Sequence, residues 1–151
     1  MPDRKLFEYN LCDAWGRPLR NVTVSEGEKN MVIFSTYESP EPRVEWRDMH
    51  TTTISDEAIC ELKRIIKESK VQEIEEVEEN KDLFILDGYI QDFYFADEIS
   101  YTEVSVHNMQ AYEFKPRKYP KVCTLKKLLQ DMANVLVPEG VSSECFELSV
   151  E

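Results

Sequence analysis

Glycine is scarce in this sequence of 151 residues, and its scarcity excludes the common nucleotide-binding folds. The four glycines are Gly16, Gly27, Gly88 and Gly140, and no two of them are close together. A loop that cradles phosphate groups needs glycines at short spacing, because they let the backbone approach the ligand and expose its N–H groups. Walker A and Rossmann fingerprints are therefore absent.

Histidines and paired cysteines are equally scarce, which weighs against a metal centre. His50 and His107 stand alone, without the H-x-H or H-x-x-x-H spacing of common metal ligands. The cysteines are also scattered, at Cys12, Cys60, Cys123 and Cys145. No C-x-x-C pair occurs, so we expect reduced structural thiols and predict neither a bound metal nor a cofactor.

Catalytic signatures are missing as well. The sequence has no G-x-S-x-G motif, and no cysteine has a histidine within a few residues. One enzymatic alternative stays open, in which scattered residues such as His50, His107, Glu103 and a cysteine assemble into a site. A carboxylate pair such as Asp92 with Glu103 carries little weight, because 30 acidic residues produce such pairs by chance.

Long apolar runs and basic residues are also in short supply. No apolar run approaches the ~20 residues of a membrane-spanning helix. The first five residues also lack the apolar core of a secretory signal, so we expect a cytoplasmic protein.

The chain is strongly acidic, with 18 Lys and Arg residues against 30 Asp and Glu residues, for a net charge of −12. We therefore expect no binding to nucleic acid or anionic membranes, whose phosphates require Lys and Arg. A basic protein is the expected kind of partner.

The first half of the chain carries a pattern of short strands followed by an amphipathic helix. Apolar residues make up 42% of the sequence, and its length suits one domain. Runs rich in β-forming residues predict four strands, over residues 6–11, 20–25, 31–37 and 43–52. Ser55 predicts the N-cap of a helix over residues 56–69, whose apolar residues recur at spacings of three and four.

The second half predicts three more strands and a longer helix. Asp87-Gly88 stands between two β-rich runs, which predicts a type I′ turn with Gly88 at positive φ. With a second turn at residues 96–98, residues 83–109 would form a three-strand meander. A helix is predicted over residues 119–137, with Pro120 in its first turn. Residues 71–79 favour a short helix between these groups.

The predicted order is ββββ-α-(α)-βββ-α-(β), which is typical of an α+β fold with antiparallel meanders rather than a parallel α/β fold. We expect a single domain over residues 1–140. The tail over residues 141–151 contains an alternating apolar pattern that favours an edge strand.

The second half resembles a type of small, uncharacterised bacterial α+β protein. The matching residues are Asp87-Gly88, Phe93-Tyr94-Phe95, Asn108 and the helical run over residues 125–136. In that type, a helix precedes a strand, an Asp-Gly turn, two further strands, an Asn-containing loop and a final amphipathic helix. The chain departs from it at Gln91, where an aromatic is expected, and in an extra segment over residues 112–121. The resemblance implies the fold and no assigned activity.

Charge is distributed unevenly along the chain. Residues 68–82 contain seven acidic side chains and two basic ones, whereas residues 115–127 contain six basic side chains and no acidic one. A helix N-terminus presents unpaired N–H groups and the positive end of the helix dipole. The candidate binding residues for an anion or acidic peptide are therefore Lys115, Arg117, Lys118 and Tyr119. The alternative is a solvated basic face, balanced by the acidic side chains of residues 73–79.

The sequence favours a non-enzymatic binding module. Its acidic charge, aromatic strands and missing catalytic motifs are typical of an accessory, immunity-type or regulatory protein that covers a basic surface. The alternatives are the scattered-residue enzyme and a domain that works only as a subunit, recognised by an exposed apolar patch or edge strand.

Overall fold

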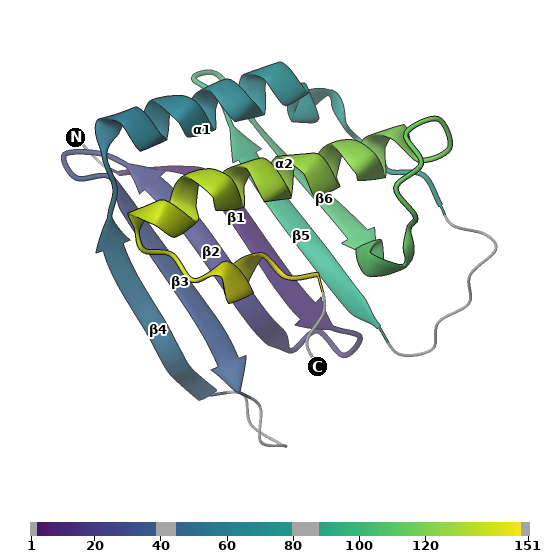
Figure 1. Ribbon diagram of the computed structural model, residues 1–151, viewed down its shortest axis with the longest axis horizontal. Helices are drawn as coiled ribbons and strands as arrows, with labels where there is room; N and C mark the ends of the chain where they lie inside the picture. Colours follow the sequence, from purple (N-terminus) through teal and green to yellow (C-terminus); the bar gives the residue numbers. More distant parts are fainter. Residues whose placement is uncertain (1–2, 39–44, 80–87, 149–151) are drawn as a thin grey trace.

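The computed structural model describes residues 3–38, 45–79 and 88–148, which form one antiparallel sheet with two helices across one face (Figure 1). The strands are β1 (Arg4–Asp13), β2 (Pro18–Glu26), β3 (Met31–Glu38), β4 (Glu45–Thr53), β5 (Tyr89–Ala96) and β6 (Tyr101–His107). The helices are α1 (Asp56–Ser69) and α2 (Pro120–Leu136). The strand order is β4-β3-β2-β1-β5-β6, so β4 and β6 form the two edges.

This architecture confirms the α+β class but groups the strands differently from the predicted separate meanders. The N-terminal strand β1 pairs with β5, with Phe7 opposite Phe95, and this pairing joins both groups into one six-stranded sheet. Both edges of β5 are occupied, by β1 and β6. The strand predicted before Asp87, Asp87 itself and residues 43–44 lie outside the described residues.

The predicted positive φ of Gly88 is wrong. The described glycines with positive φ are Gly16 (82°) and Gly140 (112°). Gly88 is required for a different reason: a Cβ atom there would lie only 1.7 Å from the side-chain oxygen of Asn108. The absence of a side chain therefore allows a close approach between the start of β5 and the end of β6.

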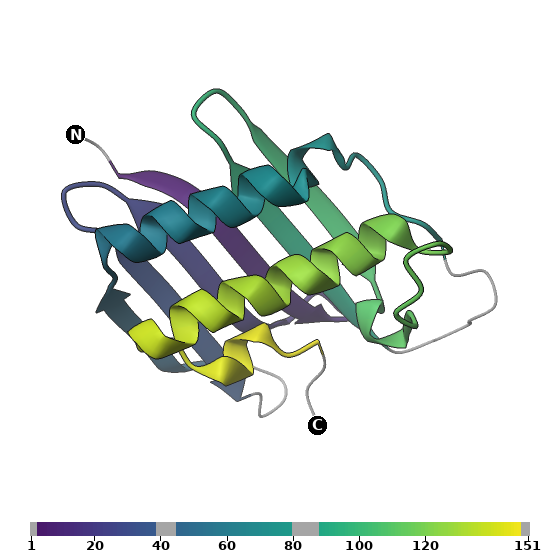
Figure 2. The ribbon, with the colours of Figure 1, turned by 45° about the horizontal axis from the view of Figure 1, so that its top comes forward.

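The core lies between the helices and one face of the sheet. Side chains alternate along β1, so that Phe7, Tyr9 and Leu11 are fully buried while Glu8 and Asn10 point to the other face. The helices contribute a second layer that includes Leu62, Leu125, Leu128 and Met132. Each such side chain stabilises the fold by roughly 1.5–3 kcal/mol. Figure 2 shows both helices on the same face, so no described helix covers the opposite face of the sheet, which is called the uncovered face below.

Local signals set the ends of both helices. The Ser55 hydroxyl accepts a hydrogen bond from Ala58 N at 3.1 Å, which confirms the predicted N-cap of α1. Helix α1 ends at Ser69, and its C-cap residue Lys70 has a φ of 58°, in the left-handed region. The short helix predicted over residues 71–79 is reduced to a 3-10 turn, Val71–Glu73. None of the described helices is long and apolar enough to cross a membrane.

The described part of the tail is not the predicted edge strand. Residues Ser143–Phe146 form a 3-10 turn that starts at Ser142, whose hydroxyl accepts from Glu144 N. Two apolar residues of this tail lie in the core, where Cys145 is fully buried and Phe146 is 8% exposed. Packing against β2 and β3 therefore prevails over the strand pattern.

Candidate functional site

The N-terminus of α2, the predicted anion site, is occupied by a carboxylate of the chain itself. The Glu78 Oε1 atom accepts a hydrogen bond from Lys121 N at 2.9 Å, and its Oε2 atom accepts one from Val122 N at 3.1 Å. The backbone carbonyl of Glu78 also accepts from the Tyr112 hydroxyl at 2.7 Å. Helix α2 therefore takes its cap from an acidic residue of the preceding segment, because Tyr119 at the N-cap position makes no side-chain capping bond.

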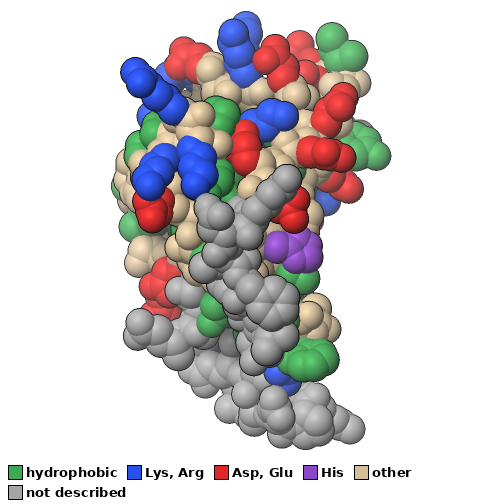
Figure 3. All heavy atoms as spheres, turned by 90° about the vertical axis from the view of Figure 1, so that its right-hand side faces the viewer, with side chains coloured by type: hydrophobic (Ala, Val, Ile, Leu, Met, Phe, Trp, Pro, Cys, Tyr) green, Lys and Arg blue, Asp and Glu red, His purple; other side chains and the backbone are tan. Residues whose placement is uncertain are grey.

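The predicted basic residues lie around this capped helix end. Lys115 forms an ion pair with Glu113 at 2.6 Å, and the Lys118 ammonium lies 5.2 Å from the centre of the Tyr119 ring. Tyr119 is buried, whereas Arg117 is exposed and makes no hydrogen bond or ion pair within the described residues. Figure 3, which views the molecule from the right-hand side of Figure 1, shows Lys and Arg interspersed with Asp and Glu.

The histidines do not come together with each other or with Glu103. His50 on β4 stacks on Phe34 on the helix-covered face, with ring centroids 5.3 Å apart, whereas His107 lies on the opposite edge strand β6. Five strand spacings separate these edges, or about 24 Å. Glu103 lies four residues before His107, about 13 Å along the same strand. These residues therefore do not assemble the scattered-residue site.

The cysteines show no sign of an activated nucleophile. Burial raises the pKa of the Cys145 thiol to about 11. Partial burial, together with the charges of Asp92 and Asp13, also raises the pKa of Cys12. A raised pKa disfavours the reactive thiolate. Among the described residues, no three His, Cys, Asp or Glu side chains are arranged to hold a metal ion.

The feature missed at the sequence level is an acidic hollow on the uncovered face of the sheet. It has a volume of about 350 Å³ and is formed by β1, β5 and β6. Its polar and aromatic lining residues are Glu8, Asn10, Asp92, Tyr94, Glu103 and Ser105. Strand register sets them in two rows across the sheet. Glu8, Tyr94 and Glu103 form one row, and Asn10, Asp92 and Ser105 form the other.

One carboxylate in this acidic hollow has no partner among the described residues. Glu8 accepts from Thr23 Oγ1 at 2.8 Å and from Lys5 Nζ at 3.3 Å, and Asp92 accepts from Ser105 Oγ at 2.6 Å. Glu103 is exposed and makes no hydrogen bond or ion pair within the described part of the chain. The Lys5 ammonium also lies 4.2 Å from the centre of the Tyr94 ring. At the rim of the hollow, the Lys5 ammonium is thus already bound by the Glu8 carboxylate and by the face of the Tyr94 ring.

Exposed apolar side chains extend this surface beyond the hollow. Ile33 on β3 is 40% exposed, and Met49 on β4 is 55% exposed. Ile33 lies opposite Thr23, which bonds to Glu8, so its side chain shares the uncovered face with the hollow. The face therefore combines an apolar region at β3 and β4 with an acidic region at β1, β5 and β6.

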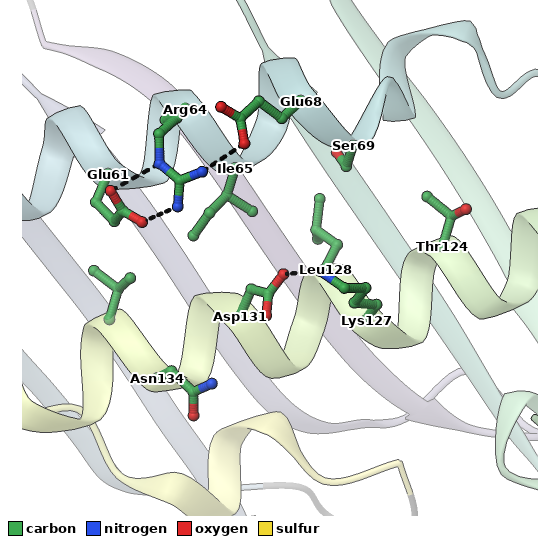
Figure 4. Close-up of a pocket in the computed structure, with 11 residues that line it drawn as sticks. Glu61, Arg64, Ile65, Glu68, Ser69, Thr124, Lys127, Leu128, Asp131 and Asn134 are labelled. Carbon is green, nitrogen blue, oxygen red and sulfur yellow. Dashed lines mark hydrogen bonds and ion pairs between the residues drawn. The ribbon is translucent and has the colours of Figure 1, made fainter.

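A larger groove between α1 and α2, of about 600 Å³, has its charges paired within each helix (Figure 4). Arg64 donates to Glu61 and Glu68 on α1, and Lys127 lies 3.0 Å from Asp131 on α2. Each charged side chain in these exposed pairs therefore already has a partner of opposite charge. The groove therefore offers a ligand fewer free charged groups than the uncovered sheet face does.

Comparisons of the chain with protein-family models, with curated proteins and with solved structures found no match. The candidate surface consequently rests on geometry alone. Its residues lie at alternate positions of predicted strands. They come together only because β1 pairs with β5, and local sequence does not encode that pairing.

Proposed function

We propose that the protein is a binding module that holds a basic partner protein against the uncovered face of its sheet. The observation that carries this proposal is the acidic hollow, where Glu8, Asp92 and Glu103 converge and Glu103 has no described partner. An Arg or Lys side chain placed beside Glu103 would gain charge-assisted hydrogen bonds. The net charge of −12 would also steer a basic protein toward the module.

An uncovered sheet face is not by itself a binding site, because antiparallel sheets commonly leave one face in water. Three features favour an interface here. The hollow gives the face a concave acidic centre, Ile33 and Met49 add exposed apolar area, and Tyr94 and Tyr101 stack with centroids 5.3 Å apart. Aromatic and apolar groups with a charged recognition point are typical of protein interfaces.

This role is that of an accessory, immunity-type or regulatory protein acting in the cytoplasm, without chemistry of its own. The separation of His50 from His107 and the raised pKa values of Cys12 and Cys145 both weigh against the enzymatic alternative. A binding module needs neither an activated nucleophile nor a general base. It needs a complementary surface, and the acidic hollow with the exposed apolar side chains near it supports this role.

The proposal can be tested with a fluorescent Arg- and Lys-rich peptide as the probe. Fluorescence anisotropy at about 0.15 M salt would compare the wild type with Asp92→Asn/Glu103→Gln. The matched control is Glu75→Gln/Glu76→Gln, which removes two exposed negative charges outside the sheet. We expect the first variant to weaken binding by about tenfold, or about 1.4 kcal/mol. The control should change binding by less than about twofold.

Two results would contradict the proposal. Equal weakening in both variants would show that the peptide senses only net charge. If the peptide binds neither the wild type nor an unrelated protein of similar acidity at the same concentration, the acidic hollow is left without a ligand. Circular dichroism of both variants would establish that the fold is intact.

A further inference from the structure

The tip of the β5–β6 hairpin presents an apolar side chain beside a groove at the C-terminal half of α1. The groove has a volume of about 450 Å³, and its apolar lining includes Ile66 from α1, Ala96 from β5 and Ile99 from the hairpin tip. The Ile99 side chain is 95% exposed. Figure 2 shows this hairpin extending past α1. A single exposed isoleucine is common, so the surroundings of Ile99 decide whether it marks a binding site.

The hairpin tip is held in place by several hydrogen bonds. The Asp97 carboxylate accepts from Ile99 N and from Ser100 N, each at 2.7 Å, and Asp97 N donates to Ser100 O at 3.0 Å. The Arg4 guanidinium donates to the Asp97 carbonyl and ties the tip to β1. An apolar anchor that is already ordered loses little conformational entropy on binding.

Two of the four cations that line the groove have no partner within the part of the chain that the structure describes. Glu26 binds both Arg4, at 2.9 Å, and Lys63, at 2.7 Å. By contrast, the side chains of Lys67 and Lys70 are exposed and make no hydrogen bond or ion pair within the described ranges. They suit the negative end of the α1 dipole, but their ammonium groups stay available to a ligand.

Acidic residues also line the groove, and they limit where an acidic ligand can bind. They are Glu73, Asp97 and Glu98. The Asp97 carboxylate is engaged by the hairpin backbone, and these hydrogen bonds lower its pKa. Lys67, in the last turn of α1, and Lys70, its C-cap, have no side-chain partner among the described residues, so the charge that attracts a ligand is concentrated on that side of the groove.

We infer that this groove binds an acidic segment of a partner protein. One apolar side chain of the segment contacts Ile66, Ala96 and Ile99, and its carboxylates pair with Lys67 and Lys70. Charge complementarity selects this occupant, because unpaired lysines beside apolar area favour a ligand that is both acidic and apolar. The groove belongs to the α1 side of the molecule and the acidic hollow to the uncovered sheet face. The inference therefore goes beyond the proposed function and does not depend on it.

The test is a selection from a displayed library of random 16-residue peptides against the immobilised full chain. We expect enriched peptides to share an apolar residue flanked by Asp or Glu. A labelled enriched peptide is then measured by fluorescence anisotropy. Ile99→Ser should weaken its binding at least tenfold, and Lys67→Ser/Lys70→Ser at least fivefold, more strongly at low salt.

Matched controls remove the same kinds of side chain elsewhere. Trp15→Ser removes an exposed apolar side chain from the turn between β1 and β2, and Lys29→Ser/Lys121→Ser removes two exposed lysines. Both controls should bind within twofold of the wild type. All four variants change exposed or half-exposed side chains, and unchanged urea unfolding curves would confirm that they fold.

Three outcomes would overturn the inference. The first is a selection that enriches no acidic-apolar sequence, and the second is binding that Ile99→Ser and the lysine variant leave unchanged. The third is a dimer in sedimentation experiments that dissociates on Ile99→Ser, which would assign the groove to a second copy of this chain. Failure of the basic-peptide experiment on Asp92 and Glu103 would affect none of these readouts.

Discussion

Gly88 and Asn108 lie against each other where β5 begins and β6 ends, so closely that a Cβ atom on residue 88 would come within 1.7 Å of Asn108 Oδ1. The same oxygen accepts a hydrogen bond from Tyr89 N at 2.9 Å, and Asn108 N donates to Tyr89 O at 2.8 Å. Asn108 has a φ of 57°, which asparagine tolerates better than most residues. The missing side chain at residue 88 therefore makes room for a polar clamp.

Gly88→Ala should destabilise the protein by about 1–3 kcal/mol, because the new methyl group displaces the Asn108 amide and breaks the hydrogen bond that Tyr89 N donates to it. Urea unfolding followed by circular dichroism would measure the change. The control is the same substitution in an Asn108→Gly background, which lacks the clashing side chain. There Gly88→Ala should cost less than half as much, and an equal cost in both backgrounds would contradict the explanation.

Glu78 offers a second stability prediction, since its carboxylate caps α2 from outside the helix. Glu78→Ala should destabilise the protein by about 1–2 kcal/mol, because it removes the acceptor for two backbone N–H groups and a negative charge at the positive end of the dipole. The neighbouring exposed Glu79→Ala is the control and should stay within about 0.5 kcal/mol. If both variants unfold at the same urea concentration, Glu78 contributes no cap.

The same cap bears on the predicted anion site at Lys115, Arg117, Lys118 and Tyr119. An external anion at the α2 N-terminus would have to displace Glu78, which already binds the N–H groups of Lys121 and Val122. Binding of inorganic phosphate should therefore be stronger in Glu78→Ala than in the wild type, as isothermal titration calorimetry would show. Equal phosphate affinity would place the anion elsewhere on the basic segment, away from the helix end.

Local sequence signals predicted both helices and several strands, and long-range pairing accounts for what they missed. Ser55 and the apolar spacing of residues 56–69 specify α1 within one segment, so its bounds were predicted correctly. The acidic hollow depends on Glu8 meeting Tyr94, which lies far along the chain. The Glu78 cap likewise joins residues 43 positions apart. No periodicity or turn motif encodes such contacts.

Gly88 illustrates a different kind of error. A glycine after aspartate between β-rich runs is typical of a hairpin turn, and that pattern led to the predicted positive φ. Glycine also occurs where another group approaches the backbone closely, and the sequence does not distinguish these two reasons. Here the approaching group is Asn108, a residue twenty positions later.

Glu26 joins β2 to β1 and α1, and its contribution to stability should depend on pH. Its partial burial alone would raise its pKa, but hydrogen bonds and charges from Lys63 and Arg4 outweigh burial and lower the pKa below its usual value near 4.5. The stabilisation is therefore present above that usual value and is lost as pH falls through the lowered pKa of the folded state. Glu26→Gln should cost about 1 kcal/mol at pH 7 and much less near pH 3.

Urea unfolding of the wild type and Glu26→Gln across this pH range would measure the difference. Glu28→Gln, which removes one negative charge from the exposed hairpin that follows, is the control. A difference between Glu26→Gln and wild type that is constant from pH 7 to pH 3 would contradict the ionic explanation.

The two cysteines Cys60 and Cys145 should differ sharply in reactivity. Cys60 is exposed on α1, whereas Cys145 is fully buried under the C-terminal segment, and burial raises its thiol pKa to about 11. At pH 8, iodoacetamide should alkylate Cys60 in the native protein and reach Cys145 only after denaturation, because alkylation needs an accessible thiolate. Peptide mass spectrometry would assign each modified residue, and Cys60→Ser should remove the fast phase. The buried positions of Cys145 and Phe146 require that the Ser143–Phe146 turn stays packed against β2 and β3. Alkylation of Cys145 in the native protein as fast as that of Cys60 would contradict this packing.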